Sequence, residues 1–216
     1  MCPKKRKIKT ILFACVLAIS CLTIGGCWKP DFLAIGTGGA YMTGKEEVTR
    51  RQGGDMDKAI VSLQKVVSQD PTYKDSLTLL GRAYYKKERY GDAYQILQRA
   101  VVVNQEDEIA WLALGITQLR LNDYDRGIKS LQGGLTLFNK LNVSGYRGFR
   151  YWDRSGKVKA ATRRAIFVVS KETEAKREDT IQSVEVLLRV IDEEEWYLKL
   201  ESAQDIRREI DGVGTR

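Results

Sequence analysis

Four consecutive acids, Asp192 to Glu195, are the residues best suited to acid–base chemistry in this chain. On a helix, Asp192 and Glu195 share one side, where paired carboxylates could move protons or hold a hard cation. A run of acids on a long helix is, however, usually a solvated face. The chain also contains no histidine, which excludes Ser-His-Asp and Cys-His catalysis and histidine-ligated zinc. We therefore predict that the protein is not an enzyme, with no catalytic residue, no metal site and no cofactor.

Cys27 is the residue best placed for covalent modification. It follows a basic block, Lys4 to Lys9, and an apolar run from Ile11 to Ile24. That run is shorter than the roughly 20 residues that a permanent membrane-spanning helix needs. A basic block, a short apolar run and small residues are the parts of a secretory signal, with cleavage expected near Gly26. The alternative is an uncleaved membrane anchor with four incidental thiols.

The sequence Ile24-Gly25-Gly26-Cys27 resembles the lipobox of bacterial lipoproteins. The resemblance implies that residues 1–26 are a signal peptide and that Cys27 becomes a lipidated first residue, which anchors the protein to a membrane. In such lipoproteins an Asp after the cysteine favours the inner membrane. Trp28 stands there in this chain, which implies an outer-membrane location facing the periplasm. Residues 27–50, which are rich in glycine, are then predicted to be a lipidated tether.

The charge balance argues against nucleic acid as a partner. The whole chain has 36 Lys and Arg against 28 acids, a formal net charge of +8. Removing residues 1–26 takes away five of these cations and no acid, which leaves +3. The high isoelectric point therefore belongs largely to the signal, and we predict no nucleic-acid partner.

Residues recur along the chain at a spacing of 34 positions, which marks a repeat architecture. The recurring sets are Ala59, Leu63 and Gln64; Ala93, Leu97 and Gln98; Gly127, Leu131 and Gln132; and the pairs Leu80-Gly81 and Leu114-Gly115. Small residues such as Gly81 and Ala93 would let two antiparallel helices approach closely, while Leu80 and Leu97 fill the space around them. Gly81 would cost roughly 1 kcal/mol in a helix without such a packing reason.

This pattern resembles the tetratricopeptide repeat over roughly residues 40–140. The resemblance implies an all-α fold, with a short superhelix of about two and a half repeats at residues 51–140.

The segments after the repeats have other patterns. Residues 141–156 are rich in aromatic side chains and Arg and predict a loop, which either binds a glycan or a protein or covers the end of the stack. Residues 157–216 predict C-terminal helices: one over 157–176, where "AIFVV" could also be a strand, and a longer one from Asp179 to about Ile210.

The inner wall of such a superhelix implies a partner-binding surface. The residues at the corresponding positions that we select are Arg82, Tyr85, Lys86, Leu112, Ile116, Leu119 and Arg120. One end of this set is basic and the other apolar, which suits a protein or peptide partner with an apolar stripe and some acids. The alternative is that the chain's own C-terminal helices cover the apolar part.

Together these patterns predict a membrane-anchored, protein-binding scaffold or assembly factor in a bacterial envelope. The rival hypothesis is an envelope enzyme or glycan-binding protein acting on cell-wall polymer, with the aromatic loop as its site.

Overall fold

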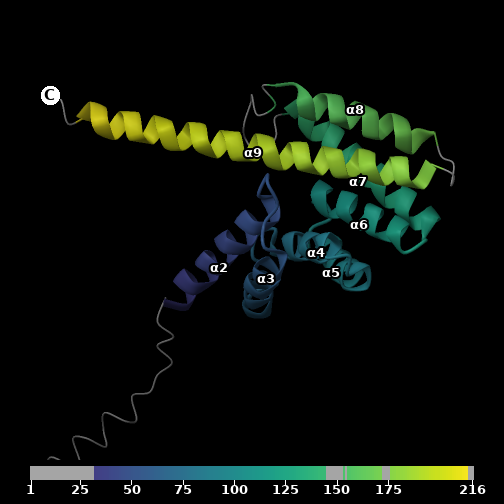
Figure 1. The fold of residues 1–216 in the computed structure, drawn as a ribbon, viewed down its shortest axis with the longest axis horizontal. Helices are drawn as coiled ribbons and strands as arrows, with labels where there is room; N and C mark the ends of the chain where they lie inside the picture. The colour runs from purple at the N-terminus through teal and green to yellow at the C-terminus, as the bar shows by residue number, and fades with distance from the viewer. Residues whose placement is uncertain (1–31, 145–152, 154, 172–175, 214–216) are drawn as a thin grey trace, which may run out of the picture. The chain divides into compact units, whose positions relative to one another are not determined.

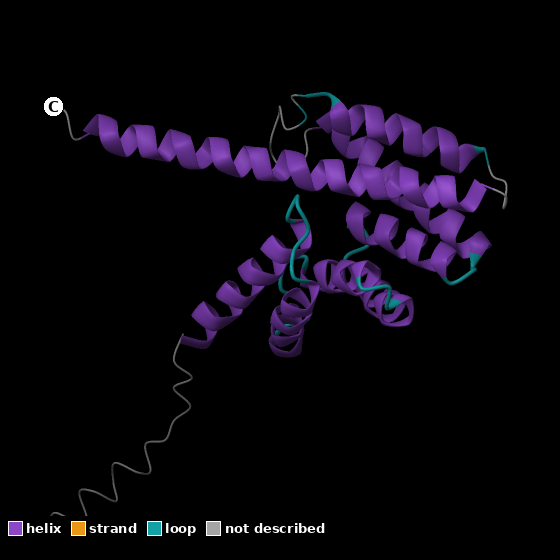
Figure 2. Ribbon diagram, viewed as in Figure 1, coloured by secondary structure: helices purple, strands orange, loops and turns teal. Residues whose placement is uncertain are grey.

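The computed structural model describes residues 32–144, 153, 155–171 and 176–213, all of them helical or in short connections (Figure 2). The chain divides into two units, Met1–Gly36 and Thr37–Arg216. The first contributes only the start of one helix to the described part, so the account below concerns the second. The described helices are α2 (Phe32–Thr49), α3 (Met56–Gln69), α4 (Ser76–Lys86), α5 (Tyr90–Val103), α6 (Glu108–Arg120), α7 (Tyr124–Ser144), α8 (Lys157–Ser170) and α9 (Arg177–Val213). None of them is both long and apolar enough to cross a membrane.

Successive helices pair and stack, as the 34-residue period predicts. α4 packs on α5, α6 on α7, and each pair contacts the next through α3 with α4 and α5 with α6 (Figure 1). A Cβ atom at Gly81 would lie 2.4 Å from Leu97 Cγ, and one at Gly115 would lie 2.6 Å from Leu131 Cγ. These distances are far below normal contact, so glycine is what allows each pair to close.

Local signals fix where the helices begin. The side chain of Asp55 accepts a hydrogen bond from the backbone N–H of Lys58 at the start of α3, and Asp107 does the same for Ala110 at the start of α6. Such N-caps satisfy amide groups that a helix leaves without a partner. Asn122, in the turn after α6, has a left-handed backbone with φ of 61°, a conformation that asparagine tolerates better than most residues.

The predicted tether at residues 27–50 is wrong for its larger part. Residues 32–49 form α2, and Tyr41 and Val48 are buried in the core of the first repeats. A Cβ at Gly44 would meet Leu63 Cγ at 2.5 Å, so α2 packs on α3 through the same glycine–leucine contact as the later pairs. Within the described residues, the stack therefore contains three helix pairs, α2–α3, α4–α5 and α6–α7, where the sequence predicted about two and a half repeats. Residues 27–31 lie outside the described part of the chain.

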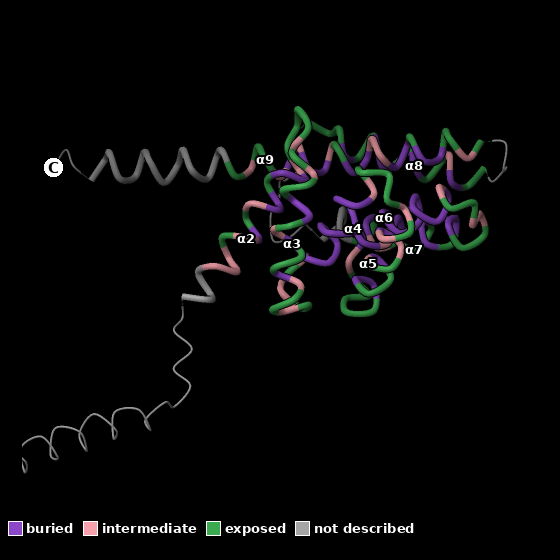
Figure 3. Tube along the Cα trace, turned by 60° about the horizontal axis from the view of Figure 1, so that its bottom comes forward, coloured by how far each residue is buried: buried purple, intermediate pink, exposed green. Residues whose placement is uncertain are grey.

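The C-terminal helices finish the stack. α8 and α9 lie side by side, α8 contacts α7, and α9 contacts α6 (Figures 1 and 3). The segment "AIFVV" is helical within α8, and α9 begins two residues before the predicted Asp179. α7 runs on to Ser144, into the predicted loop at 141–156. Most of that loop, residues 145–152 and 154, lies outside the described residues, and so do Cys27 and the whole predicted signal.

Candidate functional site: a groove along α9

α9 occupies much of the inner wall that the sequence assigned to a partner. Its apolar residues Ile181, Val184, Leu187, Leu188 and Ile191 share one buried cluster with Leu112, Ile116 and Leu119 of α6. Those three side chains are 0, 1 and 0% exposed. The prediction that they bind a partner is therefore wrong: they are core residues, because burying them against α9 removes a large apolar surface from water.

Acids on one face of α9 pair with the basic residues of the same wall. Glu178, Glu185 and Asp192 follow one another at seven-residue spacing, two helical turns, so they share a face. Asp192 accepts a 2.5 Å hydrogen bond from Arg82, and both residues are buried. Burial alone would lower the pKa of Arg82, but the adjacent charge and hydrogen bond of Asp192 raise it. Arg82 therefore remains charged and holds α9 in place.

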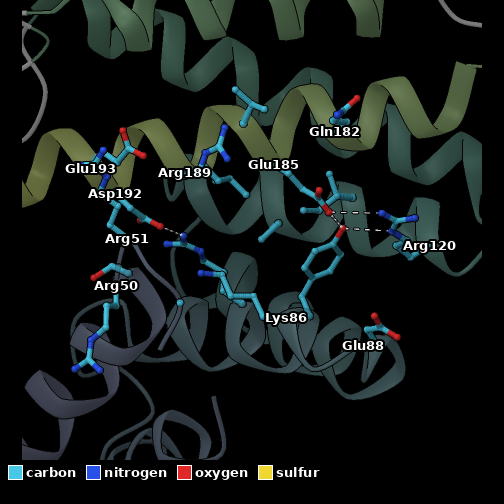
Figure 4. Close-up of a pocket in the computed structure, with 18 of the residues that line it drawn as sticks. Arg50, Arg51, Lys86, Glu88, Arg120, Gln182, Glu185, Arg189, Asp192 and Glu193 are labelled. Carbon is cyan, nitrogen blue, oxygen red and sulfur yellow. Dashed lines mark hydrogen bonds and ion pairs between the residues drawn. The ribbon is translucent and has the colours of Figure 1, made fainter. Parts of the chain in front are cut away.

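Arg120 and Tyr85 form the second polar connection to α9. Arg120 donates two hydrogen bonds to Glu178, at 2.8 and 3.0 Å, and its Nη2 lies 3.6 Å from Glu185. The Tyr85 hydroxyl donates to Glu185 at 2.5 Å. Burial and this acceptor carboxylate raise the pKa of Tyr85, so its hydroxyl stays protonated at any physiological pH. Figure 4 shows Glu185 and Arg120 reaching toward each other across this contact.

Lys86 stands apart from these pairs. Its ammonium donates a 2.5 Å hydrogen bond to the backbone carbonyl of Val48, and no described carboxylate lies within ion-pair distance. Burial lowers the pKa of Lys86 to about 8, and the charge of Arg82 adds to the effect while Asp192 partly offsets it. An anion close to this ammonium would favour its charged form and offset part of the desolvation.

An open groove remains between α9 and the ends of α2, α4 and α6, with a volume of about 620 Å³. Its polar lining includes Arg50, Arg51, Arg82, Lys86, Glu88, Arg120, Gln182, Glu185, Arg189, Asp192 and Glu193. Figure 4 shows Lys86 and Glu88 on one wall and Gln182, Arg189 and Glu193 on α9 opposite. The volume lies in the range of small-ligand and peptide side-chain sites.

The charges of this groove are only partly neutralised. Arg82 and Arg120 are paired with α9, and Arg50 is paired with Glu46 and Glu47. Within the described residues, Arg189 has no ionic partner. The Arg51 guanidinium donates a 3.4 Å hydrogen bond to the Tyr197 hydroxyl. Two acids of the lining, Glu88 and Glu193, are likewise unpaired there. With Lys86, the groove keeps three available cations against two available acids.

Three of the four acids singled out from the sequence have structural partners. Asp192 binds Arg82, Glu195 lies 3.5 Å from Lys45, and Glu194 accepts a hydrogen bond from Ser155. Among the described residues, no group of three or more potential metal ligands comes together. These carboxylates attach α9 to α2, to α4 and to the segment before α8.

Of the residues selected from the sequence as partner-binding, Arg82, Tyr85, Lys86 and Arg120 line this groove, whereas Arg51 and Arg189, which also line it, were not selected. Those two belong to the loop after α2 and to α9, segments for which the repeat pattern defines no inner-wall position. The signal that could have found Arg189 is its spacing on α9: Gln182, Val186, Arg189 and Glu193 recur at helical intervals beside the apolar stripe.

A family model described as tetratricopeptide repeat matches residues 51–115. The matched segment contains α3, α4, α5 and the first half of α6. Among curated proteins, the general transcriptional corepressor trfA of Dictyostelium discoideum is 28% identical over 82 residues. That match covers 38% of this chain and 6% of the corepressor, so the chain spans a small part of the relative's length. The described part of the chain is thus a helical array with tetratricopeptide-like repeats, a kind of repeat that generally binds proteins.

Proposed function

We propose that this protein is a membrane-anchored scaffold of the bacterial envelope that binds an acidic segment of a protein partner in the groove along α9. The observation that carries the proposal is the groove itself, where Arg51, Lys86 and Arg189 are available beside α9 in a repeat array. The partly exposed Val186 adds apolar lining, which suits a segment that mixes acids with aliphatic residues.

The membrane part of the proposal rests on the sequence. The basic block, the short apolar run and Ile24-Gly25-Gly26-Cys27 support export, cleavage and lipidation at Cys27, with Trp28 favouring the outer membrane. Two or more acyl chains would hold the protein firmly, since a single chain binds membranes only marginally.

The first experiment measures binding of a synthetic peptide that alternates Glu with Leu, labelled with a fluorophore, by anisotropy. Arg51→Gln with Arg189→Gln should weaken binding by at least about tenfold, because each charged hydrogen bond contributes roughly 1.5–3 kcal/mol. Glu88→Gln should strengthen it by removing a repulsive carboxylate. The matched control is Lys65→Gln with Arg99→Gln, which makes the same charge change at exposed positions of α3 and α5.

These variants avoid the residues that hold α9. Changing Arg82 or Arg120 to Glu would place an acid against Asp192 or Glu178 and release the helix, so lost binding would not identify the groove. Equal weakening in the groove variant and the control variant would reject the groove as the site. In cells, Cys27→Ala should abolish labelling by a fatty-acid analogue and leave a longer, unprocessed chain. Label retained in that variant would reject Cys27 as the lipidated residue.

A further inference from the structure

The outer face of α8 is strongly basic. The helix and its C-cap carry five cations and no acid: Lys157, Lys159, Arg163, Arg164 and Lys171. All five are exposed, and within the described part of the chain none forms an ion pair. The opposite face of α8, with Val158, Ala165 and Val169, is buried against the rest of the fold. Figure 3 shows these exposed and buried stretches alternating along the helix.

Two large apolar side chains interrupt this basic face. Ile166 is 39% and Phe167 57% exposed, and they directly follow Arg163, Arg164 and a buried alanine. The Lys171 ammonium lies 4.2 Å from the centre of the Phe167 ring. An exposed aromatic ring beside a cation is well suited to a place where a charged surface adjoins an apolar layer.

The acids of the described residues near α8 form hydrogen bonds with groups other than its five cations. Asp153 accepts hydrogen bonds from the backbone N–H groups of Val158 and Lys159 at the start of α8. Glu194 of α9 accepts one from Ser155. The start of α9 adds Lys176 and Arg177 beyond Lys171, and the sequence between them contains Glu172 and Glu174, outside the described residues. Among the described residues, the elements that pack on α8 therefore supply no carboxylate that pairs with the cations of this face.

We propose that this face of α8 docks on an anionic membrane surface, with Phe167 and Ile166 entering the boundary between headgroups and acyl chains. The five cations match a surface of anionic lipids, which attracts each Lys or Arg held near it. The apolar pair favours a lipid surface over a nucleic acid, since the grooves and phosphates of DNA offer Phe167 no apolar layer. The docking goes beyond the proposed function, because neither partner binding along α9 nor lipidation at Cys27 requires it.

The test uses the full chain with Cys27→Ala, so that acylation does not contribute, and measures co-sedimentation with vesicles. One set of vesicles is phosphatidylcholine alone, and the other contains about one third phosphatidylglycerol. The ratio of the two partition coefficients reports the electrostatic part, to which the basic block Lys4 to Lys9 also contributes. Because that block is the same in every variant, the differences between variants report on α8. The parent protein should prefer the anionic vesicles.

Arg163→Gln with Arg164→Gln should lower partitioning into anionic vesicles by about 25-fold, roughly fivefold for each cation. Phe167→Ser should lower it several-fold on both kinds of vesicle. The control Lys65→Gln with Arg99→Gln has the same net charge and should change it little. Circular dichroism should show all variants folded, since these exposed cations contribute little to stability.

Equal losses in the α8 variant and the control would overturn the proposal, since net charge alone would then explain the binding. No preference of the parent for anionic vesicles would also overturn it. A third result would overturn it as well: a protein that binds neither kind of vesicle but binds double-stranded DNA through Arg163 and Arg164.

Discussion

Breaking the buried Arg82–Asp192 pair should cost far more free energy than replacing the whole pair. The two side chains are 9 and 10% exposed, and their charged atoms lie 2.5 Å apart. Arg82→Met leaves the Asp192 carboxylate buried without its donor. Such a change typically destabilises a protein by about 3–5 kcal/mol, whereas an apolar replacement of both partners is often close to neutral.

Each single change leaves one charge of the pair buried with only more distant partners. After Asp192→Leu, Arg82 still experiences the charges of Glu195 and Asp75, and after Arg82→Met, Asp192 still experiences the charge of Lys86. We therefore expect both single variants to be destabilised, and the double variant to recover at least about 2 kcal/mol relative to the sum of the two.

The assay is urea unfolding of the four proteins followed by circular dichroism, with free energies extrapolated to water. The exposed pair Arg89–Asp92, with side chains 51 and 46% exposed, supplies the control cycle, in which coupling should stay below about 1 kcal/mol. Additive effects at Arg82 and Asp192, or coupling no larger than in the control, would refute the conclusion that this pair fixes α9 on the inner wall.

Two further predictions concern the helix contacts and the groove lysine. Gly81→Leu should lower the free energy of unfolding by roughly 1–3 kcal/mol, because the new leucine side chain must displace Leu97. The control Gly91→Leu should have a smaller effect, since nothing lies within 4 Å of the Cβ position of Gly91. Equal thermal midpoints for the two variants would contradict the close α4–α5 contact. The pKa of Lys86 is about 8 in the folded protein, below the ordinary value of 10.5. Between these two pH values the unfolded chain therefore binds more protons than the folded protein does. The contribution of Lys86 to the free energy of unfolding thus rises with pH across that window. Urea unfolding at several pH values should show this rise in the parent relative to Lys86→Met, and parallel curves for the two proteins would contradict a lowered pKa.

The repeats could be predicted where side-chain spacing carries the signal. The contacts Gly81–Leu97 and Gly115–Leu131 lie in a fixed register, and the residues at that register are enough to identify the pairs. The sequence did not predict α2 as part of the stack, for two reasons. Its glycine, Gly44, stands 37 residues before Gly81, which is three more than the period. The apolar residues of α2 are also not gathered on one face of the helix. Its place in the core depends on Tyr41 and Val48 meeting the other helices, which no local pattern shows.

The candidate site was only half predictable for a similar reason. The sequence indicated that the inner wall suits a segment with an apolar stripe and acids, and α9 has those features: Ile181 and Val184 pack on the wall while Glu185 and Asp192 pair with it. What one sequence could not decide was whether this segment belongs to the chain or to a partner. Sequence reasoning kept both possibilities open, and the packing of α9 on Leu112, Ile116 and Leu119 decides between them for the apolar part of the wall.

The position of α9 changes what a partner can gain from this protein. A helix that competed for the inner wall would have to displace the buried stripe of α9 and leave Arg82 without Asp192, at a cost of several kcal/mol before any new contact formed. A segment that enters the groove beside α9 displaces only water and meets Lys86 and Arg189, which have no carboxylate to give up within the described fold. The available cations therefore favour binding next to α9, with α9 itself as one wall of the site, over replacement of α9.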